Sequence, residues 1–180
     1  MAYRQLFLFV EGDDDERFLR AVIEPLCRSV YDHVRFVKFS MVKQDKIAAY
    51  LRSVEAIPDA DYLLVGDLDR LPCVTAAKER VQGKFPPVDP ARVQIVKAEI
   101  ESWYCAGLTA QDPDLGIPEL ANPTDTEGIT KEIFNRAVSQ RGFLRVPVMT
   151  GILERFDLES AARRNRSFHY FLRKHLPFAA

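Results

Sequence analysis

The sequence contains little cysteine and no long apolar run. Its three cysteines, Cys27, Cys73 and Cys105, lie far apart and form no C-x-x-C pair. This spacing excludes a disulfide framework and a zinc ribbon, and it fits a protein of the reducing cytoplasm. The longest apolar run near the start, Leu6–Val10, is too short for a signal sequence or a membrane span. We therefore expect no membrane association.

The chain also has almost no net charge. Its 25 Lys and Arg residues against 26 Asp and Glu residues leave a net charge of −1 over 180 residues, so no global positive field draws the protein to a polyanion. Binding to nucleic acid must then depend on a local patch or on a bound metal. No Walker-type G-x-x-x-x-G-K-[ST] motif is present, so any ATPase would be a separate chain.

Apolar strands alternate with helical patterns in the first part of the chain. Four strands are expected, at Arg4–Val10, Val34–Phe39, Tyr62–Val65 and around Val93–Ile95, with helical spacing of apolar residues between them. This order predicts an α/β fold with a mainly parallel sheet flanked by helices. We expect residues 1–106 to form this core, 107–126 a proline-containing loop, and 127–180 a helical extension packed on the core.

Acidic residues follow three of the expected strands. Glu11 comes after the first strand, Asp67 and Asp69 after the third, and Glu99 and Glu101 after the fourth. Because parallel strands end at the same edge of a sheet, these groups should converge there. Carboxylates without nearby His or Cys suit Mg²⁺ or Mn²⁺. For Asp67 and Asp69 the alternative is a polar turn after a buried strand.

The spacing of these acids adds detail. Asp67 and Asp69 are two apart, so in an extended chain both side chains project to one face. Glu99 and Glu101 are two apart on an expected helix, Ala98–Ala106, and diverge by about 200°, so only one of them faces the site. The neighbouring Lys97 either meets a phosphate, pairs with a carboxylate, or is a plain surface lysine.

The motif Glu11-Gly12-x-x-Asp15 after one strand and Asp67-x-Asp69 after another resembles the Toprim superfamily, whose pattern is E-G-x-x-D and then D-x-D. The resemblance implies a Toprim/Rossmann-like core. Two later segments, Lys97–Trp103 (KAEIESW) and Arg166–Leu172 (RSFHYFL), are similar to stand-alone bacterial Toprim-like proteins. Those proteins are related to nucleases of the overcoming-lysogenization-defect (OLD) type.

The resemblance implies Mg²⁺-dependent phosphodiester chemistry, most simply a nuclease acting on DNA or RNA. In that case Asp67 and Asp69 bind metal, and Glu11 is a further ligand or the general acid/base. Gly12, Asp15 and Lys97 support the site, and Glu99 or Glu101 is an extra metal ligand. The chain is too short to hold the gate of a topoisomerase.

A basic stretch near the end of the chain supports a polyanion substrate. Residues 161–180 contain no acidic residue, and the alternative is a solvated helix end whose cations complement the helix dipole. A local patch of this kind neutralises a few phosphates. The residues of this expected nucleic-acid patch are Arg163, Arg164, Arg166, Arg173 and Lys174.

Two other functions remain open at this point. One is a receiver-like phospho-acceptor switch, which also uses acids after the first strand, an Asp after the third, and a late lysine such as Lys97. The other is a non-catalytic regulatory module of a multi-protein defence or repair system, whose acidic pocket binds Mg²⁺ or a nucleotide without cleavage. Under any of these functions, a separate ATPase is a candidate partner protein. The D-x-D motif has no explanation in the receiver-like switch.

Overall fold

The computed structural model describes residues 3–108 and 117–176. By the contacts within it, the chain divides into two compact units, Met1–Val96 and Lys97–Phe178, here called the first and second unit. The helix after the fourth strand, which the sequence analysis placed in the core, belongs to the second unit. Part of the expected proline-containing loop, residues 109–116, lies outside the described residues.

The first unit is built on a four-stranded parallel sheet. Its strands have the spatial order β2-β1-β3-β4, which confirms the predicted α/β fold. Strand β1 is central, with Leu8 paired to Phe36 on one side and to Leu63 on the other, and this position explains its continuous apolar run. The bounds of the strands are β1 Gln5–Val10, β2 His33–Lys38, β3 Ala60–Asp67 and β4 Val93–Val96.

The strand order changes direction at β1. From β1 the chain passes to β2 on one side, and from β2 it returns to β3 on the other side. Right-handed crossovers then put the connecting helices on opposite faces of the sheet. The point between β1 and β3 is a topological switch point, where α/β sheets bind ligands at the carboxyl edge. The connecting elements are α1 Asp13–Phe18, the π-helical η1 Leu19–Ile23, α2 Glu24–Cys27, α3 Gln44–Glu55, α4 Val74–Lys84 and the 3₁₀ turn η2 Pro90–Arg92.

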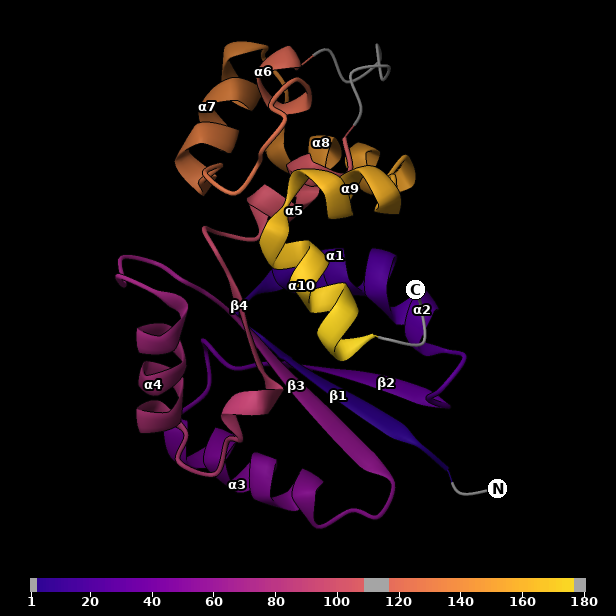
Figure 1. The fold of residues 1–180 in the computed structure, drawn as a ribbon, viewed down its shortest axis with the longest axis vertical. Coiled ribbons are helices and arrows are strands. Elements are labelled where there is room, and N and C mark those ends of the chain that lie inside the picture. Colours follow the sequence, from indigo (N-terminus) through magenta and orange to yellow (C-terminus); the bar gives the residue numbers. More distant parts are fainter. Residues whose placement is uncertain (1–2, 109–116, 177–180) are drawn as a thin grey trace. The chain divides into compact units, whose positions relative to one another are not determined.

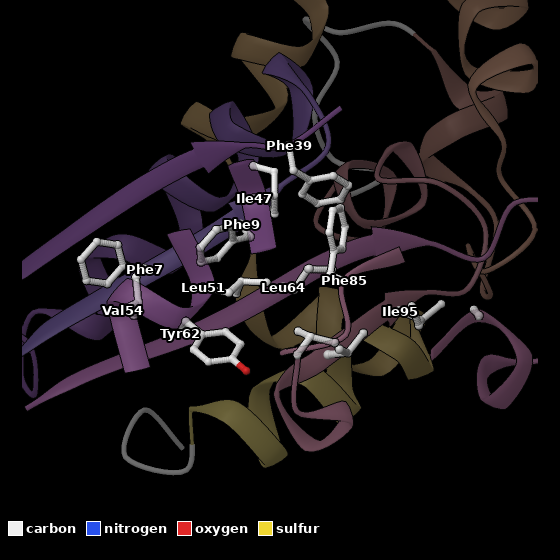
Figure 2. Close-up of a cluster of buried hydrophobic side chains, with 13 residues drawn as sticks. Phe7, Phe9, Phe39, Ile47, Leu51, Val54, Tyr62, Leu64, Phe85 and Ile95 are labelled. Atoms are coloured by element: carbon white, nitrogen blue, oxygen red, sulfur yellow. The ribbon is translucent and has the colours of Figure 1, made fainter. Parts of the chain in front are cut away.

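Helices α3 and α4 lie against one face of the sheet (Figure 1). Phe9 and Tyr62 from the strands pack in one cluster with Leu51 from α3 and Ala77 from α4. The same cluster, drawn in Figure 2, includes Phe85, which follows α4. Because Phe39 and Phe85 sit in this core, the segments that carry them hold fixed positions at the carboxyl edge of the sheet.

The second unit is helical throughout its described part. The expected helix Ala98–Ala106 begins only at Glu101, and a short helix lies inside the expected loop. Asn165 separates the last two described helices, and its side chain accepts a hydrogen bond from the amide of Phe168 that caps the second of them. The helices are α5 Glu101–Ala106, α6 Pro118–Ala121, α7 Lys131–Gln140, α8 Arg145–Glu154, α9 Leu158–Arg164 and α10 Arg166–His175.

An aromatic cluster fixes α5 to α10 in this unit. The ring of Trp103 lies 5.1 Å from that of Phe168 and 5.2 Å from that of Phe171. All three side chains are fully buried. Phe168 and Phe171 are therefore core residues, as their helical spacing indicates. Within the described ranges, no helix is both long and apolar enough to cross a membrane.

Candidate metal centre

Glu11 and Asp67 meet at the switch point of the sheet. Glu11 directly follows β1 and Asp67 ends β3, the neighbouring strand. The amide of Asp67 donates a hydrogen bond of 3.4 Å to Oε1 of Glu11. A Cβ atom at Gly66 would lie 3.2 Å from the same oxygen, so glycine at this position gives the carboxylate its room. Two acids 56 residues apart thus share one edge of the sheet.

Asp69 reaches the same place by a different backbone from the one expected. Its φ of 51° is in the left-handed region, so the Asp67-Leu68-Asp69 segment is not the extended chain that the sequence analysis assumed. Asp and Asn tolerate this conformation better than other non-glycine residues. The carboxylate of Asp69 forms an ion pair of 2.5 Å with the guanidinium of Arg80 on α4.

The three carboxylates line one cavity of about 280 Å³. Glu11, Asp67 and Asp69 form its acidic side, and Arg80 and Lys84 of α4 bring two cations to it. The remaining lining comes from the end of β3, from the segment after β2 and from the end of α4, namely Gly66, Phe39, Ser40, Val81 and Phe85. The cavity therefore combines acidic, basic and apolar walls within the first unit.

Burial is the main influence on Glu11 in this cavity. It raises the pKa of the Glu11 carboxyl above its ordinary value, and the charge of Asp69 raises it further. The hydrogen bond from the Asp67 amide and the charges of Lys84 and Arg80 act in the opposite direction. A partly desolvated carboxylate beside a second acid is stabilised by a bound cation.

The donors suit a hard divalent cation by their chemistry, since all are carboxylate oxygens. Within residues 3–108 and 117–176, no three His, Cys, Asp or Glu side chains are arranged to hold a metal ion together. The carboxylate of Asp69 is paired with Arg80. Mg²⁺ commonly keeps several waters and uses one or two protein carboxylates together with substrate phosphates, so a site of this ion does not require three protein ligands.

Gly12 and Asp15 position the start of helix α1. The amide of Gly12, the N-cap residue, donates a 3.0 Å hydrogen bond to Oδ2 of Asp15, and Asp15 is buried. This cap orients the helix that leaves directly after Glu11. Lys38 at the end of β2 pairs with Asp13 and Glu16 at 2.7 and 3.3 Å, so the first turn of α1 is also held to β2.

Glu99 and Glu101 lie in the second unit, and each has a partner there. The carboxylate of Glu99 accepts a hydrogen bond of 2.5 Å from the amide of Lys131, the first residue of α7. Glu101 is 2% exposed and forms an ion pair with Arg145. Because Glu99 precedes α5 instead of lying on it, the divergence expected for two helical residues does not apply.

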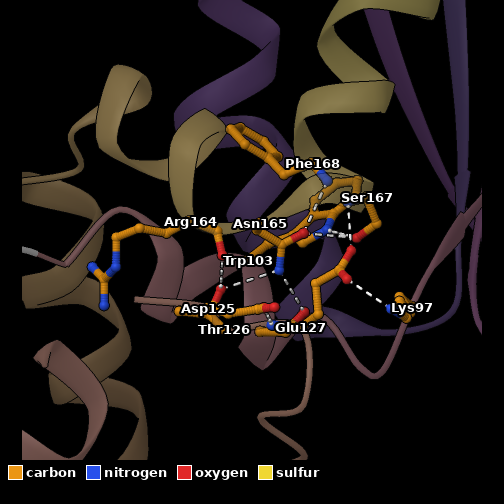
Figure 3. Close-up of polar contacts among 10 residues, drawn as sticks. Lys97, Trp103, Asp125, Thr126, Glu127, Arg164, Asn165, Ser167 and Phe168 are labelled. Atoms are coloured by element: carbon orange, nitrogen blue, oxygen red, sulfur yellow. Dashed lines mark hydrogen bonds and ion pairs between the residues drawn. The ribbon is translucent and has the colours of Figure 1, made fainter. Parts of the chain in front are cut away.

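Lys97 pairs with a carboxylate, one of the roles that the sequence left open. Its Nζ lies 2.7 Å from Oε2 of Glu127, which is buried (Figure 3). The other oxygen of Glu127 accepts a 2.9 Å hydrogen bond from the amide of Ser167. Lys97 thus neutralises a buried carboxylate that holds the first turn of α10.

The residues of the expected nucleic-acid patch differ in the contacts that they make. The guanidinium of Arg164 donates to the carbonyls of Pro123, Ala106, Leu108 and Ala121, so it joins three chain segments. Arg163 pairs with Glu159 on its own helix. The exposed cations of α10 are Arg166 and Arg173, while Nζ of Lys174 lies 5.5 Å from the ring centre of Tyr170.

Arg80 and Lys84 are the lining residues that the sequence analysis missed. They lie four residues apart on the helix that follows the D-x-D strand, and cations at this spacing share one helix face. This spacing, on the helix that follows an acidic strand end, is the feature of the sequence that could have identified them. The same spacing also fits a solvated helix face, so by itself it does not identify a binding site.

Comparison with known proteins gives one match at the level of structure. No family model matches the sequence, and neither does any curated protein. The chain is similar to a solved structure of the C-terminal region of the Burkholderia pseudomallei OLD protein, with 15% identity, 97% of this chain and 96% of that chain covered, and a TM-score of 0.45.

Proposed function

We propose that the cavity of the first unit binds Mg²⁺ or Mn²⁺ and that the protein hydrolyses phosphodiester bonds in DNA or RNA. The observation that supports this most is the convergence of Glu11, Asp67 and Asp69, from two neighbouring strand ends, on one cavity that also presents two cations. Acidic groups at a topological switch point are suited to holding a cation at a ligand site. The Toprim-like order of these acids favours phosphodiester chemistry.

The side chains have separable roles in this proposal. Asp67 and Glu11 hold the metal, and Asp69 joins them when it leaves Arg80. The bound ion would supply an activated water and stabilise the leaving oxygen. If Glu11 does not hold the metal, it is instead the general acid/base, because burial raises the pKa of its carboxyl above its ordinary value. Glu99 and Glu101 remain candidates for an added ligand only if they leave their partners in the second unit.

The substrate contacts proposed outside the cavity come from α10. Arg166, Arg173 and Lys174 are the members of the basic patch whose charges no acidic side chain of α10 offsets. Such cations contribute phosphate contacts that weaken with salt. Arg163 adds to them where its pair with Glu159 opens, whereas Arg164 contributes to the fold. We place the activity in the cytoplasm, with a separate ATPase as a possible partner protein.

Two alternatives predict different results. The late lysine that the sequence offers to a receiver-like switch, Lys97, is bound to Glu127 in the second unit, whereas Lys84 of α4 lines the cavity together with the acids. Acetyl phosphate should label one Asp if that function holds. A non-catalytic regulatory module would bind Mg²⁺ in the cavity without cleaving any substrate, and its thermal stability would rise with the metal.

The test is a cleavage panel of labelled single- and double-stranded DNA and RNA with Mg²⁺, Mn²⁺ or EDTA. We expect metal-dependent cleavage that Asp67→Asn abolishes and Glu11→Gln lowers by on the order of a hundredfold or more. Glu79→Gln on α4 removes one acid outside the cavity and should cleave normally. Cleavage that persists in Asp67→Asn, or in EDTA, would contradict the proposal, and melting curves check that each variant is folded.

A further inference from the structure

Two cations of α4 face the acidic wall of the cavity. Arg80 and Lys84 line it together with Glu11, Asp67 and Asp69, and both come from one face of the same helix. A metal site alone needs no cations beside its ligands, because they repel the metal. A phosphate group carries the opposite charge and is recognised by Arg and Lys in this way.

Arg80 is held in place by a contact that a phosphate can replace. Its ion pair with Asp69 joins two side chains that are 47% and 45% exposed, and pairs this open to solvent contribute little to stability. The guanidinium offers several N–H donors in a fixed plane, which match two phosphate oxygens as well as they match a carboxylate. Exchange of Asp69 for a phosphate oxygen therefore costs little.

Lys84 is positioned by the apolar wall of the same cavity. Its Nζ lies 5.2 Å from the ring centre of Phe85 and 5.6 Å from that of Phe39. Both rings are buried in the core of the first unit, so they form a rigid surface under the ammonium group. Lys84 is thus ordered near the carboxylates although it ends α4 and is exposed.

The pairing of Asp69 links the cations of the cavity to its carboxylates. While it pairs with Arg80, the carboxylates of Glu11 and Asp67 are the two left for a metal. A phosphate on Arg80 and Lys84 would release Asp69 toward that pair and add its own oxygens. The cavity of about 280 Å³ is just below the usual size of small-molecule sites, which suits a single phosphate with its sugar.

We propose that Arg80 and Lys84 form a phosphate-binding subsite for the substrate, and that Asp69 holds Arg80 until a phosphate displaces it. This inference rests on the proposed function for the identity of the substrate. It adds an order of events, in which the third carboxylate becomes available to the metal only after the substrate has bound. The subsite itself is a property of the metal-free protein.

The subsite is tested by titrating the ¹⁵N-labelled full chain with thymidine 5′-monophosphate in EDTA, with thymidine as the neutral control. We expect the monophosphate to shift the amide resonances of α4 and thymidine not to do so. Arg80→Gln and Lys84→Gln should each weaken binding roughly tenfold. Arg52→Gln and Lys46→Gln remove the same charges from α3, outside the cavity, and should leave the affinity unchanged. Equal affinities in all four variants would overturn the subsite.

The exchange of Asp69 is tested by a double-mutant cycle with the same probe. Asp69→Asn keeps a residue that tolerates the left-handed backbone and should strengthen binding severalfold, because it frees Arg80. In the Arg80→Gln background this gain should shrink to the general gain from removing one negative charge from the cavity. Glu11→Gln is the control, because it removes the same charge from the same cavity but Glu11 bonds the Asp67 amide and not Arg80. The gain in affinity from Glu11→Gln should therefore be the same with and without Arg80→Gln. An equal gain from Asp69→Asn in both backgrounds would overturn the exchange.

The outcomes separate this inference from the proposed function. No metal is present in the titration and no bond is cleaved. If the monophosphate binds as expected but no substrate of the panel is cleaved, the proposed nuclease activity is contradicted and the phosphate-binding subsite is supported. If cleavage depends on metal but Arg80→Gln and Lys84→Gln bind the monophosphate as well as the unchanged protein does, the nuclease proposal is supported and the subsite is contradicted. Spectra of the variants without ligand show whether each remains folded.

Discussion

The indole Nε1 of Trp103 donates a hydrogen bond of 2.9 Å to the hydroxyl of Ser167, 64 residues further along the chain. The hydroxyl in turn donates a 2.8 Å hydrogen bond to Oδ1 of Asn165, and the same oxygen caps α10 at the amide of Phe168. The segments KAEIESW and RSFHYFL therefore meet in the second unit. Their residues contribute to its internal structure, which gives them a role that needs no substrate.

Ser167→Ala should destabilise the protein by about 1–3 kcal/mol. The change removes both the acceptor of the Trp103 indole and the donor to the fully buried Asn165. Urea unfolding followed by tryptophan fluorescence measures the loss, since Trp103 is the single tryptophan of the chain. Ser139→Ala, an exposed serine on α7, should change stability by less than about 0.5 kcal/mol. Equal effects of the two changes would contradict this account.

Arg164→Lys should destabilise the protein by about 2 kcal/mol or more. A lysine cannot replace the planar guanidinium that donates to the carbonyls of four residues, Pro123, Ala106, Leu108 and Ala121, and buried acceptors left without a donor cost about 1–3 kcal/mol. Arg163→Lys on the same helix is the control, because its pair with Glu159 is exposed and contributes little. Thermal melts compare the two variants, and matching melting temperatures would refute the assignment.

The carboxylates that line the cavity could be predicted from the sequence. Glu11 and Asp67 each follow an apolar run, and strand position alone determines which edge of a parallel sheet a residue reaches. The prediction needed only local pattern and topology. It was wrong about the backbone at Asp69, because a left-handed residue cannot be recognised from an Asp in a short polar segment.

The partners of the second unit could not be predicted from the sequence. Glu99 also comes after a strand, yet its carboxylate accepts a hydrogen bond from the amide of Lys131 at the start of α7. Glu101 is paired with Arg145. Arg164 stands in a basic run, and nothing in that run indicates that its guanidinium is used by distant carbonyls. Such contacts depend on helix packing between segments far apart in the chain, which no local periodicity encodes.

Gly66→Ala should weaken the response of the protein to Mg²⁺. The added Cβ atom would lie 3.2 Å from Oε1 of Glu11, so the carboxylate must move by a few tenths of an ångström. The rise in melting temperature with Mg²⁺ measures the effect. Gly83→Ala on α4 meets no atom within 4 Å. The Gly83→Ala control should keep the full response to Mg²⁺ and gain about 0.5–1 kcal/mol of helix stability. An unchanged response to Mg²⁺ in Gly66→Ala would contradict the proposed ligand role of Glu11.

Asp157→Ala should cost about 1 kcal/mol at neutral pH through loss of the N-cap of α9. Hydrogen bonds from the Ser160 hydroxyl and amide hold the pKa of the Asp157 carboxyl below its usual 3.8. Its ionised form therefore stabilises the fold above pH 3.8, and that contribution is lost as the pH falls through the lowered pKa. Urea unfolding should show that Asp157→Ala lowers the free energy of unfolding less at pH 3 than at pH 7. Asp157→Asn keeps the capping acceptor and should cost less at pH 7.

The central place of β1 has a consequence for synthesis of the chain. β1 leaves the ribosome before either of its neighbours, β2 and β3, and its edge toward β3 stays open until that strand, which ends at Asp67, has emerged. During that interval the apolar run Leu6–Val10 is exposed to other nascent chains. Non-local strand pairing of this kind folds slowly and is prone to aggregation. A chaperone that shields these five residues until β3 docks would raise the yield of folded protein.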